Sequence, residues 1–254
     1  TAIDLVADIG ESFGAHRLGD DERILRVLSS ANVACGFHAG DPRTMAAAVA
    51  SCRAAGVSIG AHPGFPDPVG FGRRAMELSR DEVRTDVLYQ VGALDGFARA
   101  AGTSVRHVCP HGRLGTLVST DRPYALGVAD AVEQYDADLA VYTLPGELEH
   151  EARARGLPVA VIGLIDRAFN DDGSVVSRRE AGAVLHDEEV IVERALSMAL
   201  DGSVRSRTGR RIDMVCDTLL MHGDNPASVR AAERVRAALD DSGVTVAPFT
   251  PVHV

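Results

Sequence analysis

The sequence contains no lysine, since all 26 basic residues are arginine. This absence excludes a lysine Schiff base and a phosphate-binding loop of the Walker A type, because both depend on a lysine ammonium group. If the reaction requires ATP, a conventional P-loop in this chain does not bind it.

Aromatic residues are scarce as well: they make up 4% of the sequence, and tryptophan is absent. A surface for stacking nucleic-acid bases is therefore not expected. The formal net charge of −10 would repel phosphate backbones and anionic lipid surfaces. No apolar run approaches the roughly 18 residues of a membrane span, and the opening "TAIDLVADIG" is typical of a strand rather than a signal peptide. We expect neither nucleic acid nor a membrane as a partner.

The four cysteines are scattered, and no C-x-x-C pair occurs. This spacing supports neither a disulfide scaffold nor a structural zinc knuckle. It favours a reducing, cytoplasmic setting.

Short apolar runs alternate with amphipathic stretches along the 254 residues. The alternation predicts a parallel sheet, and seven or eight strand–helix units favour a closed, distorted (β/α) barrel in a single domain over residues 1–254. No G-x-G-x-x-G follows the first strand, which weighs against a dinucleotide-binding fold. Strands are predicted at 3–8, 32–35, 57–62, 105–111, 138–144, 158–166 and 217–223. Helices are predicted near 21–29, 41–55, 121–134, 145–155, 187–201 and 226–242, and a further long helix begins at Ser79.

Polar side chains recur where the predicted strands end. In a (β/α) barrel, active-site groups lie at the carboxyl ends of the strands. A single strand-end histidine is more often structural, and His107, deeper in its strand, is interpreted as a core residue. The joint pattern predicts one site, and its members are Asp8, Glu11, Cys35, His38, His62, Asp67, His111, Asp166, Arg167, His222 and Asp224.

Carboxylates and imidazoles that converge in a cleft suit two kinds of catalysis. One is metal-assisted hydrolysis, in which bound water is acidified, and the other is metal-free general acid–base catalysis. Both indicate cleavage or formation of an amide, ester or similar bond, and the sequence leaves the choice open. A catalytic serine is disfavoured because no G-x-S-x-G motif occurs.

Long motifs make the sequence similar to the LamB/YcsF family, the A subunit of bacterial 5-oxoprolinase. They are "DLVADIGESFG", "SSANVACGFHAGDP", "GVSIGAHPGFPDPVGFGRR", "YQVGAL" and "MHGDNP". The resemblance implies a barrel of the glycoside hydrolase/deacetylase type that works with B-type and C-type partner subunits. It implies that the complex opens the small-molecule amide 5-oxo-L-proline to L-glutamate at the expense of ATP, with the nucleotide bound by a partner.

The resemblance also implies roles for individual residues. Catalytic roles are expected for Asp8, Glu11, His38, His111, Asp166 and His222, and substrate binding for His62, Asp67, Arg73, Arg74, Cys109, Arg167 and Asp224. A more distant likeness to metal-dependent deacetylases implies a divalent metal held by Asp8, His62 and His111.

The chain departs from the family pattern at several polar positions. The family usually has D-L-N-A-D, V-K-P-H-G-A-L-Y-N and E-x-F-A-D-R, whereas this chain has Val6, Cys109, Arg113, Gly115, Thr116 and Ile162 at the differing places. We interpret the chain as a diverged member whose substrate is 5-oxoproline or a related lactam or amide. Cys109 is a new nucleophile or, the simpler interpretation, a small buried hydrophobic residue.

Two other functions stay open from the sequence. One is a stand-alone metal-dependent amidase or deacetylase, or a paralogue recruited to biosynthesis. The other is a non-catalytic subunit that binds a metabolite, which the replacement of the family's lysine by Cys109 favours and the retained acidic and histidine residues disfavour.

Overall fold

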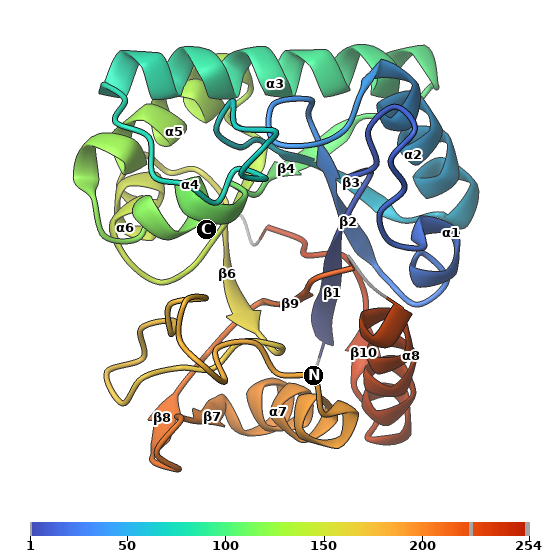
Figure 1. Ribbon diagram of the computed structural model, residues 1–254, viewed down its shortest axis with the longest axis vertical. Helices are drawn as coiled ribbons and strands as arrows, with labels where there is room; N and C mark the ends of the chain where they lie inside the picture. Colours follow the sequence, from blue (N-terminus) through green and yellow to red (C-terminus); the bar gives the residue numbers. More distant parts are fainter. Residues whose placement is uncertain (1, 224–225, 252–254) are drawn as a thin grey trace.

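Seven parallel strands close into a barrel in the computed structural model of the chain, which describes residues 2–223 and 226–251 (Figure 1). Strand β1 pairs with both β2 and β9, and β6 pairs with β9, so the sheet has no free edge among these strands. The barrel strands are β1 (Ala2–Ile9), β2 (Ser30–Ala34), β3 (Ser58–His62), β4 (Val105–Val108), β5 (Ala140–Thr143), β6 (Val159–Leu164) and β9 (Thr218–Met221). The expected closed (β/α) barrel is confirmed, with seven strands.

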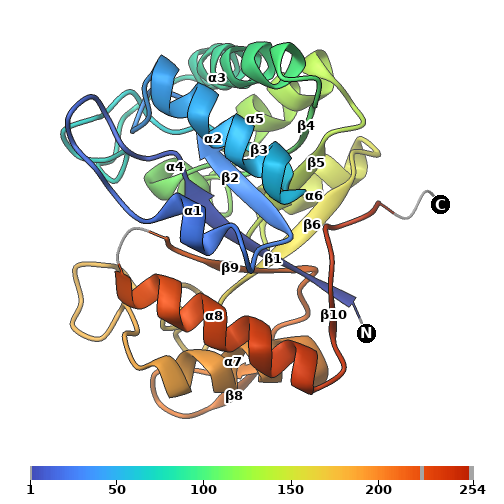
Figure 2. The ribbon, with the colours of Figure 1, turned by 90° about the vertical axis from the view of Figure 1, so that its right-hand side faces the viewer.

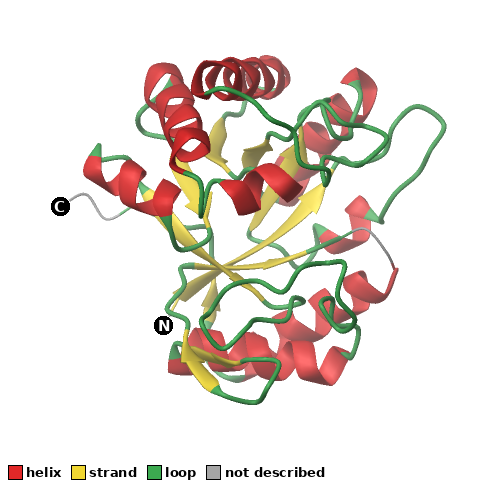
Figure 3. Ribbon diagram, turned by 60° about the vertical axis from the view of Figure 1, so that its left-hand side comes forward, coloured by secondary structure: helices red, strands yellow, loops and turns green. Residues whose placement is uncertain are grey.

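Helices lie above and below the strands in the view of Figure 3. Figure 2 shows α7 and α8 on one side of the barrel and α2, α3 and α5 on the other. The helices are α1 (Asp21–Ile24), α2 (Pro42–Ala55), α3 (Arg80–Ala100), α4 (Gly112–Leu117), α5 (Arg122–Tyr135), α6 (Glu147–Ala154), α7 (Glu188–Asp201) and α8 (Pro226–Asp241). Within the described parts of the chain, no helix combines the length and apolarity needed to cross a membrane.

Helix starts follow the capping chemistry in the sequence. The Asp41 carboxylate accepts from the backbone N–H groups of Arg43 and Thr44, and Pro42 fills the first helical position of α2. Ser79 and Glu82 form the predicted capping box at the start of α3. These local signals therefore place the first turns of two helices correctly.

Several elements differ from the sequence-based expectation. Helix α1 has 4 residues, shorter than the predicted 21–29. Strand β4 stops at Val108, because Pro110 has no N–H to donate to a strand ladder. An antiparallel hairpin of β7 (Ser203–Arg205) and β8 (Arg211–Asp213) was not predicted, since strands of 3 residues show no readable periodicity.

The strands are buried on both faces, as expected for a parallel sheet covered by helices. All residues of β2, β5, β6 and β9 are buried. The short strand β10 (Thr245–Val246) lies outside the closed ring, beside the start of β1. Polar side chains also lie inside the barrel, and the buried ones include Asp4, Asp8, Asn32 and His107.

Candidate active site

Two buried histidines meet at the carboxyl ends of β3 and β4. His62 is the last residue of β3, and His111 directly precedes α4. The Nε2 atom of His62 lies 2.9 Å from the Nδ1 atom of His111. Each ring is anchored at its other nitrogen: His62 Nδ1–H donates to the Cys109 carbonyl oxygen at 2.6 Å, and His111 Nε2–H donates to the Phe71 carbonyl oxygen at 2.9 Å.

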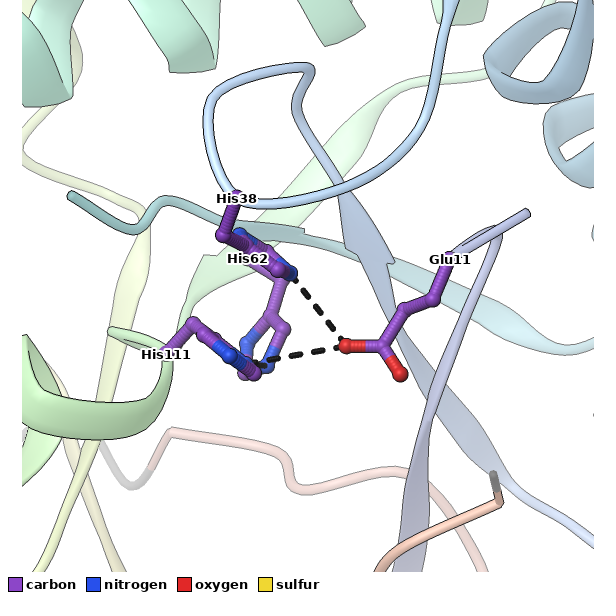
Figure 4. Close-up of side chains that lie close together, drawn as sticks. All are labelled: Glu11, His38, His62 and His111. Atoms are coloured by element: carbon purple, nitrogen blue, oxygen red, sulfur yellow. Dashed lines mark hydrogen bonds and ion pairs between the residues drawn. The ribbon is translucent and has the colours of Figure 1, made fainter. Parts of the chain in front are cut away.

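Two carboxylates and a third histidine complete this end of the site. Asp8 Oδ1 lies 3.2 Å from His62 Nε2. Glu11 Oε1 lies 3.2 Å from His38 Nε2 and 3.6 Å from His111 Nδ1. The rings of His38 and His111 are stacked, with centroids 3.6 Å apart. Figure 4 shows the three rings and the Glu11 carboxylate facing one another, a group that we call the Glu–His cluster (Glu11, His38, His62 and His111).

Burial and neighbouring charges fix the protonation of these groups when no other cation is present. Burial raises the pKa of Asp8, whereas the charge and hydrogen bond of His62, with smaller effects of His222 and His111, together lower it, so the pKa of Asp8 lies well below its usual range. Burial lowers the pKa of His62, whereas the charge of Asp8, the contact with its carboxylate, the Glu11 charge and the Cys109 carbonyl together raise it, so the pKa of His62 lies above its usual value. Burial holds the pKa values of His38 and His111 well below normal. His62 of the cluster therefore forms an ionised pair with the neighbouring Asp8, and the rings of His38 and His111 are neutral.

The Glu–His cluster has a donor set that suits a divalent metal ion. Its ligand atoms all lie within 4.8 Å of one another. The two backbone carbonyls leave His62 Nε2 and His111 Nδ1 as the nitrogens that face each other, so a cation between them is required, either a proton or a metal ion. Imidazole and carboxylate ligands are typical of zinc and other transition metals. His62 and His111 would be the central ligands, with Glu11, His38 or Asp8 completing the set.

A glycine makes room for the stacked rings. Gly72 has a φ angle of 62°, and a Cβ atom there would lie 2.8 Å from His38 Cβ and 2.9 Å from His111 Cδ2. A larger residue would push both rings away from Glu11. The "GFG" of the β3–α3 loop is therefore part of the site's construction.

On the other side of the barrel mouth, Asp166 and His222 form a second polar group. Asp166 follows β6, and its Oδ2 accepts from His222 Nδ1–H at 2.8 Å and from the His222 backbone N–H at 3.0 Å. His222 Nε2 then accepts from Arg178 Nη2 at 2.6 Å. Burial raises the pKa of Asp166, whereas the electrostatic attraction and the two hydrogen bonds of His222, with Arg178, together lower it below its usual value, so the carboxyl is ionised at neutral pH.

A cavity of about 680 Å³ joins the two groups. Its walls are positively charged, although the chain carries a net charge of −10. The lining arginines are Arg73, Arg113, Arg167, Arg178 and Arg179, and the apolar lining includes Leu144, Leu164, Val175, Val176 and Leu220. This arrangement is suited to an anionic small molecule with an apolar portion.

The structure brings most of the expected site residues together. Cys35 is buried with its thiol donating to the Val33 carbonyl oxygen and does not line the cavity, and two other residues also lie elsewhere. Asp8, His62, His111, His222, Arg73, Cys109 and Arg167 line the cavity, and Glu11, His38 and Asp166 contact residues that do. Asp67 and Arg74 pair with each other in the β3–α3 loop, away from the lining. Asp224 lies outside the described residues.

Arg167 and Cys109 have environments that limit their roles. The Arg167 guanidinium donates to the carbonyl oxygens of Ala183 and Val176. These hydrogen bonds hold the irregular segment between β6 and α7 in place. Burial, and then the nearby Arg178, lower the pKa of Arg167 to about 10. Burial and the Asp8 charge raise the pKa of Cys109 well above its usual value, so its thiol stays protonated.

Several departures from the family pattern face the same cavity. Cys109, Arg113, Gly115, Thr116 and Ile162 all line it, whereas Val6 is buried in β1. Sequence analysis did not assign a role to Arg113, Arg178 and Arg179. Arg178 and Arg179 lie in the irregular segment between β6 and α7. No periodic pattern in that segment indicated that they would line the cavity.

A closed (β/α) barrel with histidines and carboxylates at its carboxyl-end rim is the architecture of a barrel enzyme. The chain belongs to the LamB/YcsF family, whose match covers residues 3–254. The resemblance found in the sequence is thereby confirmed.

Relatives of known name cover nearly the whole chain. One is the third 5-oxoprolinase A subunit of Pseudomonas syringae pv. tomato, 45% identical over 249 residues, which are 98% of this chain and 97% of that protein. Another is the 5-oxoprolinase A subunit of Thermococcus onnurineus, 44% identical over 248 residues, which are 97% of each chain. Their names place these relatives in multi-subunit enzymes.

Solved structures agree with the fold. The crystal structure of the lactam utilization protein from Thermus thermophilus is 44% identical, with a TM-score of 0.93 over 98% of this chain and 100% of that one. The catalytic domain of a peptidoglycan N-acetylglucosamine deacetylase from Eubacterium rectale is 15% identical, with a TM-score of 0.52 over 98% of this chain and 88% of that one. The second likeness extends to the fold alone.

Proposed function

We propose that this chain is the A component of a 5-oxoprolinase-type hydrolase, which opens 5-oxo-L-proline or a closely related lactam in a cytoplasmic complex with B-type and C-type subunits. The observation that carries the proposal is that one cavity joins the Glu–His cluster, the Asp166–His222 pair and the arginine side chains. The names of relatives at about 45% identity support the lactam as the substrate class.

In the net reaction, the bond between the lactam nitrogen and the carbonyl carbon breaks. The oxygen of one water ends on that carbon, the nitrogen gains the protons of an amine, and a second water is consumed as ATP becomes ADP and phosphate. The chain has no lysine for a P-loop, so the nucleotide is assigned to a partner protein.

The chain's own residues supply binding and proton transfer. Arginines of the cavity wall bind the substrate carboxylate, and the apolar wall holds the ring. His222, oriented by Asp166, carries a proton between the attacking water and the leaving nitrogen at its Nε2, once the substrate displaces Arg178 from that atom. A divalent metal held at His62 and His111 would acidify the water and polarise the carbonyl group.

Reconstitution with partner subunits tests this proposal. The complex should form glutamate from the lactam with matching ATP consumption, and the complex with Asp8→Asn should not. Formation of glutamate at equal rates by complexes with native and Asp8→Asn chains would refute the assigned site.

A second function, a stand-alone metal-dependent amidase or deacetylase, is favoured by the metal-type donor set of the Glu–His cluster. It is distinguished by the same assay. The chain alone would then release amine or acetate from acyl amides without ATP, and a chelator would abolish this activity. A chain that binds the lactam but is inactive in every combination would instead be a metabolite-binding subunit.

A further inference from the structure

Four residues on consecutive strands form one layer inside the barrel. The strand register pairs Asp8 of β1 with Asn32 of β2, Asn32 with Gly60 of β3, and Gly60 with His107 of β4. Asn32 is fully buried and His107 is 1% exposed. The layer thus connects Asp8, which lines the cavity, with His107, which sequence analysis interpreted as a core residue.

Hydrogen bonds connect His107, Asn32 and Asp8, and each donor in this chain points toward Asp8. Asn32 Nδ2 donates to Asp8 Oδ1 at 3.0 Å, and His107 Nε2 lies 2.8 Å from Asn32 Oδ1. An ionised carboxylate only accepts, so the amide must turn its NH₂ group toward Asp8 and its oxygen toward His107. His107 must then carry its hydrogen on Nε2. Its Nδ1 atom has no hydrogen-bond partner among the described residues, consistent with an unprotonated nitrogen.

The His107 ring is held in place from its edge and from one face. A Cβ atom on Gly60 would lie 1.9 Å from His107 Nε2, so only glycine leaves space for the ring. Tyr142 stacks on the ring with centroids 3.9 Å apart, and the Tyr142 hydroxyl donates to Asp4 at 2.7 Å. The ring therefore has little freedom to leave Asn32.

We propose that Asn32 and His107 are positioning residues, which hold the Asp8 carboxylate so that its Oδ1 faces His62. His107 fixes the orientation of the Asn32 amide, and the amide fixes Asp8. The inference rests on the role of Asp8 in the proposed function. A purely packing role for His107 would need no hydrogen bond, because an apolar side chain of similar size fills a core at least as well as a buried polar one.

Kinetics in the reconstituted complex separate positioning from packing. His107→Leu should lower kcat about 10- to 100-fold with KM changed by less than about threefold, as found when groups that orient active-site residues are removed. His107→Gln keeps an N–H donor near Nε2 and should recover most of kcat. Asn32→Asp replaces the donor by a second carboxylate and should lose at least as much as His107→Leu.

Gly60 offers a matched steric control. Gly60→Ala should displace the ring and lower the melting temperature as well as kcat. Adding His107→Ala makes room for the new methyl group, so Gly60→Ala/His107→Ala should regain melting temperature while kcat stays as low as in His107→Ala. Full recovery of kcat in the double variant, or native kcat in His107→Leu, would overturn the inference.

A measurement on the isolated chain tests the hydrogen-bond chain from His107 through Asn32 to Asp8, and it needs no substrate. Nitrogen-15 NMR of the histidine rings should show His107 as the neutral Nε2–H tautomer. A ring with its hydrogen on Nδ1 would overturn the inference. If the complex fails to hydrolyse 5-oxoproline while His107 is the Nε2–H tautomer, the proposed function fails and the assigned hydrogen-bond chain stands.

Discussion

His62 Nε2 and His111 Nδ1 face each other at 2.9 Å, and backbone carbonyls occupy the other nitrogen of each ring. Two lone pairs at this distance repel unless a cation lies between them. Asp8 and Glu11 place negative charge beside the same point. This relationship underlies the first two predictions.

Metal binding should depend on these two rings. The chain is expected to bind about one equivalent of Zn²⁺ or Co²⁺, and His62→Ala or His111→Ala should weaken binding by more than about tenfold, because each removes a central ligand. Isothermal titration calorimetry measures this directly. His150→Ala, at an exposed position, is the matched control and should bind normally. Equal affinity in all three variants would contradict the assigned site.

Asp8→Asn should abolish activity while the chain stays folded. Asparagine keeps the shape of the side chain but loses the charge that a metal ligand or an ion-pair partner of His62 needs. Turnover in the complex tests the loss of activity, and the melting temperature of the variant tests whether the chain stays folded. Activity within about tenfold of native, which is about 1.4 kcal/mol of barrier height, would show that Asp8 is not central.

The purified chain should not hydrolyse ATP by itself. The absence of lysine removes the group that a P-loop uses to contact the phosphates. Phosphate release is measured with the chain alone and then with partner subunits, where we expect turnover that depends on the lactam. Robust ATP hydrolysis by the chain alone would contradict the assignment of the nucleotide site to a partner.

Cys109→Ala should keep most of the activity. The thiol is buried, and its raised pKa keeps it protonated at neutral pH, so it lacks the thiolate of a nucleophile. Turnover by Cys109→Ala and the rate of alkylation of the native thiol check this. Loss of activity together with rapid alkylation would instead identify Cys109 as the nucleophile.

Gly115→Ala should destabilise the protein, because a Cβ atom there would lie 2.4 Å from the Pro110 carbonyl oxygen. The expected cost is about 1–3 kcal/mol, typical of overpacking. Gly96→Ala is the control: it lies within α3 with no atom within 4 Å of the new methyl group, and it should be neutral or stabilising. Thermal melts of both variants give the comparison, and equal melting temperatures would refute the tight contact at Pro110.

Much of the architecture could be predicted because it depends on local patterns. Apolar runs alternating with amphipathic ones predicted the barrel, and capping residues such as Asp41 and Ser79 marked helix starts. The site could be located because parallel strands end at the same rim, so residues such as Asp8, His62 and His111 had to be neighbours.

Tertiary structure alone decided which atoms meet. Several contacts depend on loop paths that no sequence periodicity encodes. Asp67 pairs with Arg74, and Arg178 contacts His222. Gly115, Thr116 and Ile162 line the same cavity. The role of His107 became visible only through the register that aligns it with Gly60. Sequence determines which side chains reach the barrel mouth, whereas strand register and loop packing, set by contacts distant along the chain, determine their hydrogen bonds and protonation.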